Sequence, residues 1–183
     1  MSEITTVGLD LAKSVFHVVC CDLRGKVIRR KKLSRSQVCR FFAQLAPCLV
    51  GMEACSTSHY WARELIKLGH EVKQIPTQHV KAFLRGNKND YNDALAIAEA
   101  VVRPEMRFVS IKTAAQQDLQ SLSRYRQSLI RSRTGESNRI RALLAEHGVS
   151  VYRGLSALRK ILPLLIEQHG KPGKTEENRD RFI

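Results

Sequence analysis

The chain has 183 residues, 43% of them hydrophobic and 26% charged, which is the composition of a folded globular protein with one ordinary domain and an appendage. It carries 31 Lys and Arg against 17 Asp and Glu, a formal net charge of +14, so it attracts polyanions and nucleic acid is the first candidate partner. No apolar run reaches the ~18 residues that cross a bilayer, and the N-terminus lacks the pattern of a signal peptide, so we expect a cytoplasmic protein without membrane contact.

Strand patterns come first along the chain. Residues 4–10, 15–22 and 26–30 are rich in β-branched and apolar residues, and Arg24-Gly25 separates the last two runs, so we expect a three-stranded meander. Ser34 is a suitable N-cap for a helix through Leu45. The apolar run 48–52 predicts a strand buried on both faces, followed by a helix to residue 68 and a strand over 71–75. This alternation predicts an α/β fold with a mixed sheet and flanking helices.

Helical patterns dominate the second half. We expect a short helix over 77–84, a loop over 85–88, a helix over 90–102 and a last strand over 106–111. Apolar residues at helical spacing over 116–147 predict one long helix bent at Gly135, or two helices. Its apolar stripe requires a partner helix or its own domain, and we favour a coiled coil that makes a homo-oligomer through residues 116–147. Residues 156–168 predict a further short helix.

The five cysteines are odd in number and include no Cys-x-x-Cys pair. They therefore fit neither a disulfide framework nor a structural zinc site, and we expect reduced, mostly buried side chains.

Four acidic residues stand out in this basic chain: Asp10 ends the first strand, Glu53 follows the apolar run 48–52, and Asp90 and Asp93 begin a helix. Alternation places Asp10 on the same face as Gly8, which leaves room there for a metal or for backbone. Mg²⁺ or Mn²⁺ takes carboxylate oxygens and leaves coordination positions for substrate phosphates. Taken singly, these acids are also explained as a strand end, a loop start and helix-start residues. Their combination favours a divalent metal site that faces a phosphodiester.

Three segments that contain these acids, residues 7–13, 51–56 and 87–94, resemble the DEDD transposases of bacterial insertion sequences, relatives of the Piv-type DNA invertases. The basic segment 124–144 is similar to the part that follows the family's catalytic domain, and the resemblance covers residues 4–165. It implies a RuvC-type, ribonuclease H-like catalytic domain, which we place over residues 1–112. The helical spacing after it predicts a helical extension over 113–169, and the polar, turn-forming end predicts a flexible tail over 170–183. The resemblance also implies that the four acids bind Mg²⁺ or Mn²⁺ in a recombinase that cuts and rejoins DNA during transposition.

The resemblance has implications for the rest of the protein as well. Family members continue into a second domain that supplies an attacking serine, and members of the group use an element-encoded RNA to choose target and donor. We therefore expect this chain to be an N-terminal fragment or a truncated copy, with DNA and a guide RNA as partners. Ser56 and Ser58, which lie near Glu53 in the sequence, are better explained as helix caps than as nucleophiles.

Basic residues gather in the second predicted hairpin, in the segment 81–88 and on the long helix, where they can follow a phosphate backbone. The alternative for each group is an ordinary solvated face. The six histidines show no metal-ligand spacing, and we expect structural roles for them. The candidate nucleic-acid contacts are Arg29, Arg30, Lys31, Lys32, Lys81, Arg85, Lys88, Arg124, Arg126, Arg131, Arg133, Arg139 and Arg141.

Two rival functions remain open at this point. The chain can be a non-catalytic module that binds nucleic acid and dimerises. It can also be an actin-like phosphotransferase, because residues 8–14 superficially resemble a nucleotide phosphate loop. The phosphotransferase ranks last, since no second Gly-rich phosphate loop is evident.

Overall fold

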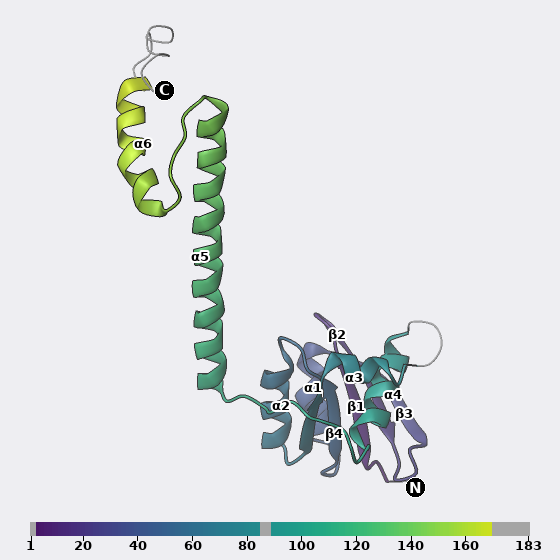
Figure 1. The fold of residues 1–183 in the computed structure, drawn as a ribbon. Coiled ribbons are helices and arrows are strands. Elements are labelled where there is room, and N and C mark those ends of the chain that lie inside the picture. The colour runs from purple at the N-terminus through teal and green to yellow at the C-terminus, as the bar shows by residue number, and fades with distance from the viewer. Residues whose placement is uncertain (1–2, 85–88, 170–183) are drawn as a thin grey trace. The chain divides into compact units, whose positions relative to one another are not determined.

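The computed structural model describes residues 3–84 and 89–169. The chain divides into two compact units, Met1–Gln117 and Asp118–Ile183. The first unit contains a five-stranded sheet in the order β3-β2-β1-β4-β5 (Figure 1). Its strands are β1 Thr6–Leu11, β2 Val15–Cys21, β3 Val27–Ser34, β4 Leu49–Glu53 and β5 Glu71–Ile75.

The sheet has an antiparallel half and a parallel half. The first three strands form an antiparallel meander, whereas β1, β4 and β5 run parallel to one another. Parallel neighbours need a crossover, and the helices between the strands supply it. The predicted α/β class with a mixed sheet is confirmed, and this strand order with these directions is that of a ribonuclease H-like fold.

Helices cover both faces of the sheet. The short helices η1 (Arg35–Gln37) and α1 (Val38–Phe42) lie with α2 (Ser58–Lys67) on one face, while α3 (Thr77–Lys81) and α4 (Asp90–Val101) lie on the other. Alternation in β1 directs Val7 and Leu9 into the core under α1 and α2. Gly8 and Asp10 therefore face α4.

Two neighbouring glycines seat α4 on the sheet. Gly8 of β1 pairs with Gly51 of β4. A Cβ at Gly8 would collide with the backbone of Ala94 and Ala98, and one at Gly51 would lie 2.8 Å from Cβ of Val101. The space beside Asp10 is thus filled by the α4 backbone. This close approach brings the first turn of α4 to the C-terminal ends of β1 and β4.

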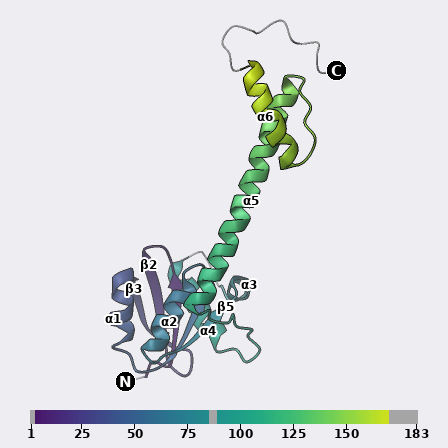
Figure 2. The same cartoon turned by 90° about the vertical axis from the view of Figure 1, so that its left-hand side faces the viewer.

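The second unit contains most of α5 (Ala114–Glu146) and α6 (Leu155–His169). Both views show the chain returning alongside the C-terminal half of α5 before α6 begins (Figures 1 and 2). Arg141 fixes this return, because its guanidinium donates hydrogen bonds to the carbonyl oxygens of Tyr152 at 3.3 Å and Gly154 at 2.6 Å. Leu158 and Leu165 of α6 are buried.

Several boundaries differ from the predictions. The strand predicted over 106–111 is wrong: Val109 makes one bridge with Gln74, and the chain leaves the sheet at Lys112, whose backbone is held by His59 and Arg63. The long helix is continuous through Gly135. Ser34 is the N-cap, as predicted, but the helix that follows begins with the 3-10 turn Arg35–Gln37 and ends at Phe42, before the predicted end at Leu45. The predicted loop 85–88 and the predicted tail 170–183 lie outside the described residues.

The cysteines are free, as expected. Burial raises the pKa of Cys20 to about 12 and that of Cys48 to about 11, so these thiols stay protonated near neutral pH. Among residues 3–84 and 89–169, no helix combines the length and the apolar character that crossing a membrane requires.

Candidate functional site

The candidate site lies where β1 and β4 end. Leu9 pairs with Met52 in the parallel ladder, so the residues that follow them, Asp10 and Glu53, lie at the same edge and on the face that α4 covers. The first turn of α4 carries Asp90 and Asp93. Asn89 is the N-cap of this helix, and its side chain accepts a hydrogen bond from the Tyr91 amide at 3.0 Å. Asp90 is therefore not needed as the cap.

A histidine that sequence reasoning assigned a structural role joins this site. His17 of β2 is the cross-strand partner of Asp10. One ligand atom each from Asp10, His17 and Asp90 lie within 4.8 Å of one another, and His17 Nε2 is 3.6 Å from Asp90 Oδ2. The imidazole is buried edge-on against Tyr91, with 5.0 Å between the ring centroids. Its Nδ1 has no hydrogen-bond partner among the described residues.

The sequence contained one signal for His17, namely the register of the first hairpin. The turn between β1 and β2 pairs Leu11 with Phe16, which sets Asp10 opposite His17. Directly opposed residues of an antiparallel pair project from the same face. A search for ligand spacing along the chain does not find such a pair, because the two residues are joined by strand pairing.

The acidic residues interact electrostatically. Burial, followed by the charge of Asp93 and then those of Asp90 and Glu53, raises the pKa of Asp10 to about 6, while His17 opposes the shift. Desolvation and like charges both disfavour an ionised carboxylate. Glu53 and Asp93 are thus close enough to affect Asp10, although the group of atoms within 4.8 Å consists of Asp10, His17 and Asp90.

The donor set fits a divalent cation. Two carboxylates and one imidazole converge, and a cation among them would relieve the repulsion that raises the pKa of Asp10. Carboxylate oxygens suit Mg²⁺ and Mn²⁺, and imidazole is a common ligand of transition metals. The residues that would hold an ion are therefore Asp10, His17 and Asp90, with Glu53 and Asp93 beside them.

The basic residues of β3 divide between the two faces of the sheet. Arg30 and Lys32 stand opposite Val19 and His17, which places them on the face of Asp10. Arg29 and Lys31 stand opposite Cys20 and Val18, on the face of α1 and α2. Lys31 Nζ lies 5.4 Å from the centroid of the Phe41 ring. Alternation thus assigns only half of this basic run to the acidic face.

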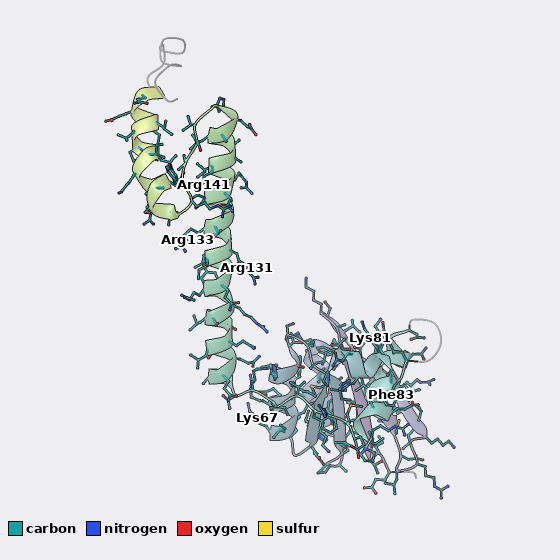
Figure 3. All side chains as sticks on the ribbon, viewed as in Figure 1. Lys67, Lys81, Phe83, Arg131, Arg133 and Arg141 are labelled. Atoms are coloured by element: carbon teal, nitrogen blue, oxygen red, sulfur yellow. The ribbon has the colours of Figure 1, made fainter. Side chains whose placement is uncertain are left out.

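The remaining candidate contacts lie on helices or outside the described residues. Figure 3 labels Lys81 at the end of α3 and Arg131, Arg133 and Arg141 on α5. Arg141 binds the return before α6, and Arg139 pairs with Glu136 at 2.8 Å. Arg124 and Arg126 are exposed, as are Arg131 and Arg133. Arg85 and Lys88 fall in the segment that the structure does not describe, and nucleic-acid contact by all of these residues stays a prediction.

Comparison with known proteins identifies relatives of this chain. The family model for DEDD transposases of the IS110 type, described as a transposase, matches residues 7–148. A probable family 20 transposase of Pseudomonas aeruginosa is 47% identical over 93% of the chain, and the transposase for insertion sequence element IS1328 of Yersinia enterocolitica is 41% identical over 94%. The chain covers 51% of each of these two relatives.

Solved structures give a weaker likeness. The RuvC structure of Thermus thermophilus has a TM-score of 0.40 and 13% sequence identity, over 51% of this chain and 89% of that protein. The same protein in complex with a Holliday junction substrate has a TM-score of 0.39 and 12% identity, over 52% of this chain and 90% of that one. The family model matches most of the chain, and by that match the chain belongs to the DEDD transposase family of the IS110 type.

Proposed function

We propose that this chain supplies the metal-dependent nuclease part of a DNA transposase, which cleaves and transfers DNA strands. One observation carries the proposal: ligand atoms of Asp10, His17 and Asp90 converge within 4.8 Å at the edge where the parallel strands end. The raised pKa of Asp10 supports it, because burial and neighbouring negative charges disfavour the ionised carboxylate and a bound cation would offset both.

In this proposal Asp10 and Asp90 would hold Mg²⁺ or Mn²⁺ through carboxylate oxygens and His17 through its imidazole, while Glu53 and Asp93 would add negative charge around the ion. When bound, a divalent ion polarises a scissile phosphate and activates the attacking oxygen. The α4 backbone, seated on Gly8 and Gly51, fixes the position of Asp90 and Asp93 relative to β1. The chain's own contribution is thus a rigid frame for its acids.

Nucleic acid reaches this face through its phosphates. Arg30 and Lys32 project from the acidic face at the edge strand β3, where they can neutralise a DNA backbone beside the acids. The exposed arginines of α5 offer a second basic surface, which we assign to a guide RNA or to DNA. Family membership supports DNA as the substrate. We also propose that the whole protein selects its DNA target through these basic surfaces.

The experiment is a nicking assay on the 183-residue chain. A branched duplex and a linear duplex are incubated with the chain and Mg²⁺, and strand breaks are measured for the native chain and for Asp90→Asn. The proposal predicts metal-dependent nicks by the native chain and at least a hundredfold fewer by the variant. Equal nicking by the two chains would contradict the assignment.

A second candidate is a module that binds nucleic acid and dimerises without cutting. Exposed leucines on α5 favour it, since Leu119, Leu122 and Leu129 are 68%, 65% and 53% exposed and repeat at coiled-coil spacing. The chain also spans about half the length of the relatives it matches. A chain that binds the branched duplex but leaves it intact at every Mg²⁺ concentration would select this candidate.

A further inference from the structure

A hollow of about 770 Å³ lies on the α1 and α2 side of the sheet, across the sheet from α4. It opens between the turn from β1 to β2, the start of α1 and the first turn of α2, and Trp61 lines its inner part. Lys13 and Ser14 in its wall follow β1 shortly after Asp10. The hollow and the acidic cluster therefore lie near the same end of β1, on opposite sides of the sheet.

The charged groups of the hollow are both cationic. Lys13 and Arg35 line it, and no residue that lines it is acidic. The guanidinium carbon of Arg35 lies 5.2 Å from the centroid of the Trp61 ring, a cation–π contact that restrains an exposed side chain. Within residues 3–84 and 89–169, neither cation forms an ion pair. Both charges thus remain available to an anion.

Hydroxyl groups and an aromatic ring complete the lining. Ser34 Oγ and Ser36 Oγ are 3.1 Å apart, and the Ser34 amide donates a hydrogen bond to Gln37 Oε1 at 2.9 Å, which fixes this corner. Hydroxyls can rotate to donate to a phosphate oxygen. Tyr60 is 46% exposed and its ring rests edge-on against Trp61, with 5.2 Å between the centroids.

We propose that this hollow holds one nucleotide of a single-stranded segment of nucleic acid. Lys13, Arg35 and the serine hydroxyls bind its phosphate, and its base stacks on Tyr60. A cation pair alone would suit any phosphate, but the exposed ring of Tyr60 beside the cations also suits a base. Stacking on an aromatic ring tolerates any base sequence, because every base has a π-face. A strand that leaves the acidic edge past the end of β1 can reach Lys13 directly.

The hollow contains its own reporter, because Trp61 is the single tryptophan of the chain. The experiment titrates a 12-nucleotide poly-dT strand into the 183-residue chain in EDTA and records tryptophan fluorescence. We expect a saturable change. The variant Lys13→Ala/Arg35→Ala should bind at least tenfold more weakly, with a salt dependence reduced by about one to two phosphate contacts.

Matched variants separate this site from the general positive charge. Arg24→Ala/Arg40→Ala removes the same charge at exposed positions that do not line the hollow and should change the affinity less than twofold. Tyr60→Phe should bind like the native chain, whereas Tyr60→Leu should lose several-fold. Lys13→Ala alone changes an exposed turn residue, so it keeps the test decisive if the double variant does not fold.

Competing ligands identify the chemistry. If the hollow binds RNA, poly-rU should compete with poly-dT. A fully paired duplex or inorganic phosphate should compete at least tenfold less well than either single strand. Equal competition by duplex or phosphate would overturn the proposal, as would equal losses in the control variant. Because EDTA removes divalent metal, failure of the nicking assay leaves this result unaffected, and the two proposals can fail separately.

Discussion

The carboxyl group of Asp10 lies in surroundings that disfavour its negative charge. Burial and the charges of Asp93, Asp90 and Glu53 raise its pKa from 3.8 to about 6. The folded chain therefore binds a proton at Asp10 more tightly than the unfolded chain does. Stability from this difference is fully present below pH 3.8 and is lost as the pH rises through about 6.

The corresponding prediction concerns the metal-free chain. In EDTA, the native chain should lose more free energy of unfolding between pH 4.5 and 7 than Asp10→Asn does. The difference should be on the order of 1 kcal/mol, because solvent reaches part of the side chain and screens its charge. Urea unfolding at a series of pH values measures it, and parallel pH profiles for the two chains would be the contrary result.

The four acidic site residues could be predicted from the sequence, whereas His17 could not. Asp10, Glu53, Asp90 and Asp93 stand out because acids are scarce in a basic chain, and strand alternation places Asp10 on a defined face. His17 was missed because its role depends on the pairing register of two strands. Spacing along one segment contains no information about a partner on the next strand.

The positions of the acidic side chains depend on how α4 packs against the sheet. Gly8→Ala should destabilise the chain by about 3 kcal/mol, because the added Cβ meets helix backbone, which cannot rotate away. Gly51→Ala should cost less, about 1–2 kcal/mol, because its added Cβ would meet Cβ of Val101 at 2.8 Å, a looser contact than the one with the Ala94 carbonyl oxygen at Gly8. Urea unfolding ranks the two variants.

Gly135→Ala is the control for this comparison. Nothing lies within 4 Å of an added Cβ at Gly135 in α5, so alanine should be neutral or stabilise the chain by up to about 1 kcal/mol. A Gly8→Ala chain as stable as the native one would mean that α4 does not rest on β1 as described.

The edge strand β3 gives a second prediction at this scale. Arg30→Ala/Lys32→Ala should weaken binding of a fully paired DNA duplex at least tenfold and lower the salt dependence by about two phosphate contacts, because these side chains share the face of Asp10. Arg29→Ala/Lys31→Ala removes the same charge from the other face and should have a clearly smaller effect. Salt-dependent fluorescence anisotropy of a labelled duplex compares them, and equal losses would reject the assignment of faces.

Sequence patterns predict most of the helices and strands but not the path of the segment 106–111. The strands of the meander and the helices after Asn89 follow directly from alternation and helical spacing. The segment 106–111 has strand-like composition, yet side chains of α2 hold the backbone at Lys112. Such tertiary hydrogen bonds join residues about fifty positions apart and leave no local pattern.

The first half of α5 carries an exposed stripe of leucines. Leu119, Leu122 and Leu129 are exposed, whereas the second half of the helix has α6 beside it. We predict that the 183-residue chain dimerises through this stripe, and that Leu119→Lys/Leu122→Lys is a monomer with unchanged stability of the first unit. Light scattering coupled to gel filtration measures both masses.

The substitutions Leu143→Lys and Leu164→Lys at other exposed leucines test whether the stripe is specific, because they add the same charge elsewhere in the second unit. They should leave the dimer intact. A native chain that stays monomeric as the protein concentration is raised would speak against the stripe as an interface.

On the proposed function, this chain binds a divalent cation through acids brought together from β1 and α4. Calorimetric titration of Mn²⁺ into the native chain at pH 7.5 tests it most directly, with Asp22→Asn as the control, since Asp22 lies in a turn and its Oδ1 accepts bonds that asparagine can also accept. We expect saturable binding by the native and control chains and at least tenfold weaker binding by Asp10→Asn. Equal Mn²⁺ affinity in Asp10→Asn, or no binding by the native chain, would contradict it.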